Sequence, residues 1–266
     1  METHNPVLHA IEWLYTLSGF CVGALVGMTG VGGGSLMTPI LILLFGIHPT
    51  TAVGTDLLYA AATKTSGSFV HNYSHTIDWR VVGRLALGSV PLTAITLLIL
   101  SRFDFAGSGF ERVITFILGV ALLATAAALV FRRQIVAYYA ARIGELSPRR
   151  TAWLTVATGA ALGVLVSITS VGAGALGVTA LILLYPRLPT ARIVGSDIVH
   201  AVPLTLLAGI GHWMIGSIDT MILDSLLVGS IPGIIVGSFI AVRVPERVLR
   251  LMLAAVLAIV GGRLVF

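Results

Sequence analysis

The chain has 266 residues, of which 57% are hydrophobic and only 10% are charged, and its formal net charge is +5 at pH 7. A soluble domain carries roughly 25% charged residues, so this composition excludes a soluble protein and predicts a polytopic membrane protein embedded in a lipid bilayer. The arginines stand in short connectors, where basic residues set membrane topology, and the positive charge therefore does not indicate a nucleic-acid partner.

Apolar segments follow one another along the chain, five on each side of a basic linker at 132–150. The first five are expected at 13–29, 35–45, 51–71, 80–101 and 112–131. The last five are expected at 151–169, 175–185, 192–212, 220–242 and 247–265. The second segment of each set is too short to cross a hydrocarbon core of about 30 Å at 1.5 Å per residue. We therefore expect the first two segments of each set to form a hairpin of short helices.

The two sets of segments are related by a duplication. The turn "TGVGGGS" at 29–35 returns as "TSVGAGA" at 169–175. After one inserted residue the matches continue at an offset of 141 residues. They include residues that shared apolar composition does not explain: Gly54 with Gly195, Asp56 with Asp197, His71 with His212, and Pro91 with Pro232. The chain is thus divided into an N-terminal repeat (1–131), a basic cytoplasmic linker (132–150) and a C-terminal repeat (151–266).

The repeats are expected to have inverted topology. A hairpin returns the chain to its starting side, so the three further spans of each repeat make an odd number of crossings. The arginines of the linker place it in the cytoplasm by the positive-inside rule, and both termini then fall in the periplasm. The connectors at 46–50 and 213–219 carry no lysine or arginine and fall outside, whereas 102–112 falls outside despite two arginines.

The two glycine-rich turns are the predicted substrate site. A helix that starts after a break inside the membrane points its free N–H groups and its positive dipole end into the space at the break. Two such breaks near the midplane form a site for a small anion. The candidate substrate-binding residues are Thr29, Gly30, Gly32, Gly33, Gly34 and Ser35 in the first turn, Thr169, Ser170, Gly172, Ala173 and Gly174 in the second, and Lys64.

Close helix packing is the alternative explanation for the glycines. One series with a spacing of four comprises Gly19, Gly23 and Gly27, and a second comprises Gly229, Gly233 and Gly237. Such small-residue faces let helices approach closely, so these two series are assigned to packing. For the two turns, packing and anion binding both stay open.

Ionisable residues within the apolar segments are candidates for coupling or gating. Asp56 and Asp197 follow Gly-Thr and Gly-Ser near the predicted starts of two segments, so N-terminal capping is the alternative explanation for both. Lys64 either contributes to the anion site or an internal ion pair, or extends its ammonium group to the cytoplasmic interface. His71 and His212 lie at segment ends, where interfacial anchoring competes with proton coupling.

Two further aspartates, Asp78 and Asp219, are expected to cap the helices that follow them. Neither a metal site nor a cofactor is expected. An enzyme is not expected either, because the sequence has no "HExxH" motif, no paired aspartates in a protease context and no Ser–His pair at an informative spacing.

The stretch "GALVGMTGVGGGSLMTPIL" at 23–41, with "VGTD" at 53–56 and the basic linker, resembles the TauE/SafE family of sulfite exporters and related anion permeases. The resemblance extends over nearly the whole chain. The matching stretch "GVLVSITSVGAGALGVTAL" at 163–181 departs from the pattern at Ser170, Ala173 and Ala175.

This resemblance implies a secondary transporter that moves small sulfur-containing anions across the bacterial inner membrane by alternating access and without ATP. Sulfite, sulfoacetate and other organosulfonates are the substrates that it implies, and proton coupling is a candidate mechanism. An anion channel, or a permease for another small oxyanion or carboxylate, is the alternative function. The sequence leaves the oligomeric state open.

Overall fold

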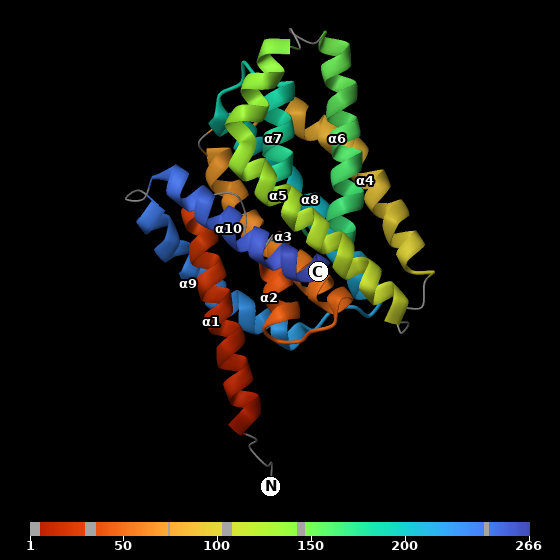
Figure 1. The fold of residues 1–266 in the computed structure, drawn as a ribbon, viewed down its shortest axis with the longest axis vertical. Helices are drawn as coiled ribbons and strands as arrows, with labels where there is room; N and C mark the ends of the chain where they lie inside the picture. The colour runs from red at the N-terminus through yellow and green to blue at the C-terminus, as the bar shows by residue number, and fades with distance from the viewer. Residues whose placement is uncertain (1–5, 30–35, 74, 103–107, 143–146, 242–244) are drawn as a thin grey trace.

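The computed structural model describes residues 6–29, 36–73, 75–102, 108–142, 147–241 and 245–266. This part of the chain forms ten α-helices and confirms the all-helical fold class (Figure 1). Their bounds are α1 Pro6–Thr29, α2 Met37–Leu43, α3 Pro49–Tyr73, α4 Trp79–Leu100, α5 Ser108–Arg142, α6 Pro148–Thr169, α7 Ala175–Leu184, α8 Thr190–Met214, α9 Thr220–Ala241 and α10 Glu246–Val265.

Six helices in the described part of the chain are long and apolar enough to cross a membrane. They include all of α4, α6 and α8 and the greater part of α5, α9 and α10. The helices α2 and α7 have only 7 and 10 residues, which confirms that the second segment of each set is short. The chain is therefore a multi-pass helical membrane protein by length and composition.

The boundary that differs most from the prediction is the end of the fifth segment. The fifth segment was expected to end at residue 131, but α5 continues to Arg142 and so includes the first part of the predicted linker 132–150. The stretch "RRQIVAYYAAR" contains neither glycine nor proline, and nothing in it opposes continuation of the helix. The expected basic linker is thus partly an extension of α5 beyond its apolar portion.

The helices pack as pairs drawn from the two halves of the chain. Helix α1 runs along α9, α4 runs along α6, and α5 crosses α10 (Figure 1). Helices α3 and α8 contact each other, and α8 also contacts α4 while α3 contacts α9. Each close pair therefore joins a segment that precedes the linker to one that follows it.

Glycines make the contact between α1 and α9 possible. A Cβ atom added at Gly23 would lie 2.5 Å from the carbonyl oxygen of Ser230, and one added at Gly19 would collide with the backbone of Leu226. From the other side, Gly229, Gly233 and Gly237 face the backbone of α1 in the same way. This confirms the packing role predicted for five of the six glycines in these series.

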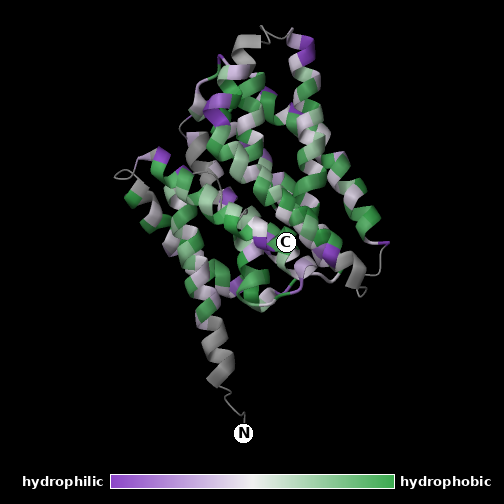
Figure 2. Ribbon diagram, in the orientation of Figure 1, coloured by the Kyte–Doolittle hydropathy of each residue, from purple (hydrophilic) through white to green (hydrophobic). Residues whose placement is uncertain are grey.

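Apolar residues predominate along most of the helices, as Figure 2 shows. Large hydrophobic side chains such as Leu98, Phe116, Ile231 and Ile259 are more than half exposed, which a membrane protein tolerates because lipid covers them. Helices α3 and α8 differ from the others because many polar side chains lie on their buried faces. These side chains include Thr55, Asp56, Thr63, Lys64, Ser196, Asp197, His200, Thr205 and His212.

Substitution of Gly159 by alanine tests the close packing of α6 on α4. A Cβ atom at Gly159 would meet the Leu85 backbone, whose Cα would be only 2.9 Å away. Overpacking of this kind costs about 1–3 kcal/mol, so Gly159→Ala is expected to lower the apparent melting temperature of the purified protein.

The matched control for this substitution is Gly83→Ala in α4. A Cβ atom at Gly83 would meet nothing within 4 Å, and alanine favours a helix over glycine by up to about 1 kcal/mol. The control should be neutral or stabilising. Equal melting temperatures for the two variants would contradict the assigned role of Gly159.

Candidate functional site

The second glycine-rich turn breaks the membrane helix as predicted. Helix α6 ends at Thr169 and α7 begins at Ala175, with Ser170 in the left-handed region at φ 59°. Gly172 and Gly174 have φ of 118° and 133°, a backbone conformation that glycine adopts without strain. The Thr169 hydroxyl braces the turn, because it accepts from the Val171 amide at 3.1 Å and donates to the Leu165 carbonyl at 2.7 Å.

The backbone amides that follow Val171 in this turn are available to bind a ligand. In the described part of the chain, the backbone N–H groups of residues 172–176 donate no hydrogen bond. Residues 169–175 are all buried. A helix start with free, buried N–H groups attracts negative charge.

Lys64 reaches this turn from the other half of the chain. It is the only lysine in the sequence, its side chain is 5% exposed, and its Nζ donates to the Ala173 carbonyl at 3.0 Å. The alternative in which Lys64 extends to the cytoplasmic interface is therefore wrong. The structure brings together Lys64 and the turn residues 169–174, which the sequence analysis had assigned to one site.

Asp56 and Asp197 approach Lys64 from two helices, and both interact electrostatically with its ammonium group. Neither aspartate caps its own helix: α3 begins at Pro49 and α8 at Thr190, so both carboxylates lie about two turns inside. The capping explanation is thus wrong, because both helices start earlier than the segments predicted at 51 and 192.

The two carboxylates have different surroundings. Asp56 Oδ2 accepts from the Thr38 amide at 3.1 Å and from the Thr38 hydroxyl at 2.5 Å, which ties α3 to the start of α2. Among the described residues, its Oδ1 and the Ser170 hydroxyl make no hydrogen bond of good geometry, although Ser170 lies close enough to interact with this carboxylate. Asp197 lies against Gly177 in α7, where any larger residue would collide with its carboxylate, and its Oδ1 also lacks a partner.

The structure describes the side chain of only one of the two candidate coupling histidines, His212. His212 is 2% exposed, and its Nε2 lies 2.9 Å from the Ser167 carbonyl of α6. Interfacial anchoring is therefore wrong for His212, although the adjacent Trp213 is 60% exposed. His71 lies in α3, but its side chain is outside the described residues.

The first glycine-rich turn is largely outside the described residues. Thr29 is the last residue of α1, and nothing is described of its side chain. The candidates Gly30, Gly32, Gly33, Gly34 and Ser35 all lie outside the described part of the chain.

Sequence reasoning missed two members of the buried polar cluster. His200 is fully buried on α8, and its Nε2 lies 2.8 Å from the Ser89 hydroxyl on α4. Thr38 was missed as the partner of Asp56. The duplication gave no signal for His200, because the residue 141 positions earlier is Tyr59.

The two capping aspartates are confirmed, and each also connects two helices. Asp78 Oδ1 accepts from the amides of Arg80 and Val81 at the start of α4. Asp219 Oδ1 accepts from the Ile222 amide at the start of α9. In addition, the Asp78 amide donates to the Ser196 hydroxyl at 2.8 Å, and the Asp219 amide donates to the Thr55 hydroxyl at 3.2 Å.

Comparison with known proteins places these features in a family. The family described as "Sulfite exporter TauE/SafE" matches residues 15–264. The chain is 38% identical over 250 residues to the probable membrane transporter protein YjnA of Bacillus subtilis, which covers 94% of this chain and 98% of the relative. It is 28% identical over 257 residues to the probable membrane transporter protein YdhB of the same organism, covering 95% of this chain and the whole relative.

A more distant relative is a probable membrane transporter of Methanocaldococcus jannaschii, 26% identical over 265 residues, with 93% of each chain covered. No solved structure matches the chain. The family consists of membrane transporters and not of enzymes. The protein with the buried Lys64 and the broken helix α6–α7 therefore belongs to the TauE/SafE sulfite exporter family of membrane transporters.

Proposed function

We propose that this protein is a secondary transporter that moves small sulfur-containing anions across the membrane by alternating access. Sulfite, sulfoacetate and other organosulfonates are the proposed substrates. The observation that carries the proposal is the contact of Lys64 with the Ala173 carbonyl at 3.0 Å, next to five amides without acceptors. A cation and free N–H groups from two parts of the chain thus converge on one buried point.

The chemistry of these groups suits a sulfonate or sulfite. Such an anion presents three oxygens, each of which accepts hydrogen bonds from backbone amides or from an ammonium group, and charge-assisted bonds are the stronger ones. Glycines at 172 and 174 let the backbone approach an anion closely. In the proposed site, the amides of the turn 172–176 bind the oxygens and Lys64 supplies the positive charge.

Asp56 and Asp197 set the charge of this site. With Lys64 protonated and both carboxylates ionised, the three groups carry a formal charge of −1. An anion that enters a site of low dielectric constant with this charge is repelled, so a positive charge must accompany it. We therefore propose proton coupling, for which Asp56, Asp197, His71 and His212 are the candidates predicted from the sequence.

The packing supports inverted repeats over 1–131 and 151–266. If the two halves are exchanged, the pair α1–α9 becomes α6–α4, and both pairs are packed through glycines. The contact of Asp78 with Ser196 becomes that of Asp219 with Thr55. In the proposed mechanism, this equivalence gives the inward-open and outward-open states similar sets of contacts.

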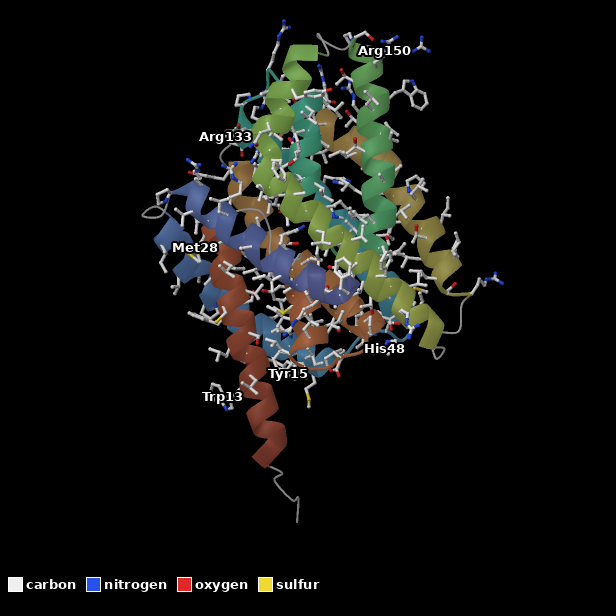
Figure 3. All side chains as sticks on the ribbon, viewed as in Figure 1. Trp13, Tyr15, Met28, His48, Arg133 and Arg150 are labelled. Carbon is white, nitrogen blue, oxygen red and sulfur yellow. The ribbon has the colours of Figure 1, made fainter. Side chains whose placement is uncertain are left out.

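The proposed orientation has the linker 132–150 in the cytoplasm and both termini in the periplasm of a bacterial inner membrane. Figure 3 shows Arg150 at the end of the molecule where α5 and α6 meet, and Trp13, Tyr15 and His48 toward the opposite end. This separation agrees with the positive-inside rule.

Replacement of Lys64 tests the substrate site. Lys64→Thr introduces the residue found at the equivalent position, Thr205, and removes the cation. Because a charged hydrogen bond contributes about 1.5–3 kcal/mol, sulfoacetate exchange in proteoliposomes is expected to fall by about 10- to 100-fold at low substrate concentration. Arg84→Gln, which removes a cation bound to the Tyr185 hydroxyl, should retain exchange.

Labelling gives a second readout of the same site in the native protein. Since the chain has a single lysine, mass spectrometry after treatment with an amine-reactive reagent reports on Lys64 alone among the side chains. Sulfite or sulfoacetate should slow its labelling. If Lys64→Thr exchanges sulfoacetate at the wild-type rate, and if no anion changes the rate at which Lys64 is labelled, then Lys64 is not part of the substrate site. Flux that follows the electrochemical gradient without exchange would identify a channel instead.

Cysteine labelling tests the orientation. In a Cys21→Ala background, which removes the chain's one cysteine, Ser147→Cys lies in the linker and Ser101→Cys lies at the end of α4, and both positions are exposed. A membrane-impermeant maleimide should label Ser101→Cys from the periplasmic side and Ser147→Cys only in inside-out vesicles. Labelling of both positions from one side would refute the proposed topology.

A further inference from the structure

His200 is a buried imidazole with one ring nitrogen unused. Its side chain is fully buried on α8, one turn after Asp197. Nε2 is bonded to the Ser89 hydroxyl at 2.8 Å, whereas Nδ1 has no hydrogen-bond partner among the residues that the structure describes. A buried polar atom without a partner is costly, so its retention at the centre of a membrane protein points to a role beyond packing.

The first half of the chain shows what packing alone requires at this place. Tyr59 is the residue that matches His200, and Ser230 is the one that matches Ser89, both at the offset of 141 residues. The Tyr59 hydroxyl lies near Ser230, but among the described residues neither hydroxyl has a hydrogen-bond partner, so the first half places the two groups at this position without the bond that joins His200 to Ser89. Of the two matched residues His200 and Tyr59, histidine titrates near neutral pH in water and tyrosine does not.

Lys64 is the charged group that faces His200. It is accompanied by Asp56 and Asp197, which face Lys64 in turn. Helix α8 also packs against α4, α6 and α7. From α4, Ser89 contacts His200, and the arginines of α4 lie near the start of that helix. The arginines of α6 are confined to its first turn, and α7 has no ionisable residue.

The formal charges of this cluster favour one particular stoichiometry. Lys64 and the two carboxylates together carry −1, and a monovalent anion alone would take this to −2. One proton on His200 restores −1, so the loaded and the empty cluster then have the same charge. A carrier that reorients both loaded and empty avoids moving an extra charge through a medium of low dielectric constant in either direction.

We propose that His200 binds the proton that accompanies each anion through this transporter. This inference rests on the proposed function. Nδ1 takes a proton from water on one side of the membrane and becomes part of an imidazolium, Ser89 keeps the Nε2 side of the ring in place, and the same proton returns to water on the other side when the anion leaves. In this proposal the carboxylates stay ionised to match Lys64, and the two donors that Thr38 directs at Oδ2 of Asp56 favour the ionised form of that group.

The test uses methanesulfonate, whose charge is constant over the pH range in which histidine titrates, so that pH acts on the protein alone. In proteoliposomes that are more acidic outside by one pH unit, electroneutral symport should drive about tenfold accumulation by the wild type. His200→Gln retains a hydrogen-bonding group for Ser89 but cannot carry the proton. This variant should exchange methanesulfonate across the membrane without accumulating it.

Two further variants control for structure. His200→Tyr introduces the residue found at the matching position and should lose accumulation in the same way. Tyr59→Phe removes the hydroxyl at the matching position and should leave the accumulation and its pH dependence as in the wild type. Where either His200 variant is not monodisperse after purification, an internal pH indicator is used in liposomes of the wild type and of Asp197→Asn. Entry of one proton per methanesulfonate in both is expected, whereas loss of proton entry in Asp197→Asn would assign the proton to the carboxylate.

The outcomes separate this inference from the function on which it rests. Accumulation by His200→Gln at the wild-type level would overturn it, as would loss of accumulation in Asp197→Asn alone, which would assign the proton to a carboxylate. If the wild type exchanges methanesulfonate but does not respond to the pH gradient, the inference about His200 is overturned and the proposed transport function still stands. Absence of both exchange and accumulation for every sulfonate and for sulfite would instead overturn the proposed function.

Discussion

The rest of the structure depends on how one buried ammonium group is accommodated. A lysine in the membrane interior is tolerated only where charge or dipoles compensate for the loss of water. Lys64 is compensated by the Ala173 carbonyl and by the negative charges of Asp56 and Asp197. These partners come from α3, from α8 and from the break between α6 and α7, so a single charge requires three distant stretches of chain to meet. The broken backbone is stable there because protein rather than lipid surrounds it.

Close packing around this centre follows from small residues. Glycines let α1 approach α9, and α4 approach α6, until backbone touches backbone. The polar helices α3 and α8 contact each other and are connected to these pairs by the links from Ser89 to His200, from Asp78 to Ser196 and from Asp219 to Thr55. Apolar faces are left for the lipid, while hydroxyl groups and charges are left for the interior. A helix as polar as α3 can therefore occupy the middle of the protein.

Sequence patterns located the helices and the break well, because the length of an apolar run and consecutive glycines act locally. They were less informative about what each polar side chain meets. Asp56 and Asp197 were compatible with capping until the starts of α3 and α8 were known, and Lys64 was compatible with an interfacial position because its long side chain reaches far. His212 lies near the end of α8 and yet turns inward to Ser167. His200 was missed because a comparison of the two halves finds only residues that they share.

The positions at which the halves differ follow a physical logic. Several glycines, prolines and aspartates match between the halves, among them Gly54 with Gly195, Pro91 with Pro232 and Asp56 with Asp197. Lys64 is matched by Thr205, and His200 by Tyr59. Because α3 and α8 meet at the centre, a second lysine at 205 would bring two ammonium groups toward one pair of carboxylates and one small anion. Like charges in a medium of low dielectric constant repel strongly. In the proposed site, where two related halves share one small anion, the cation is therefore needed in only one half.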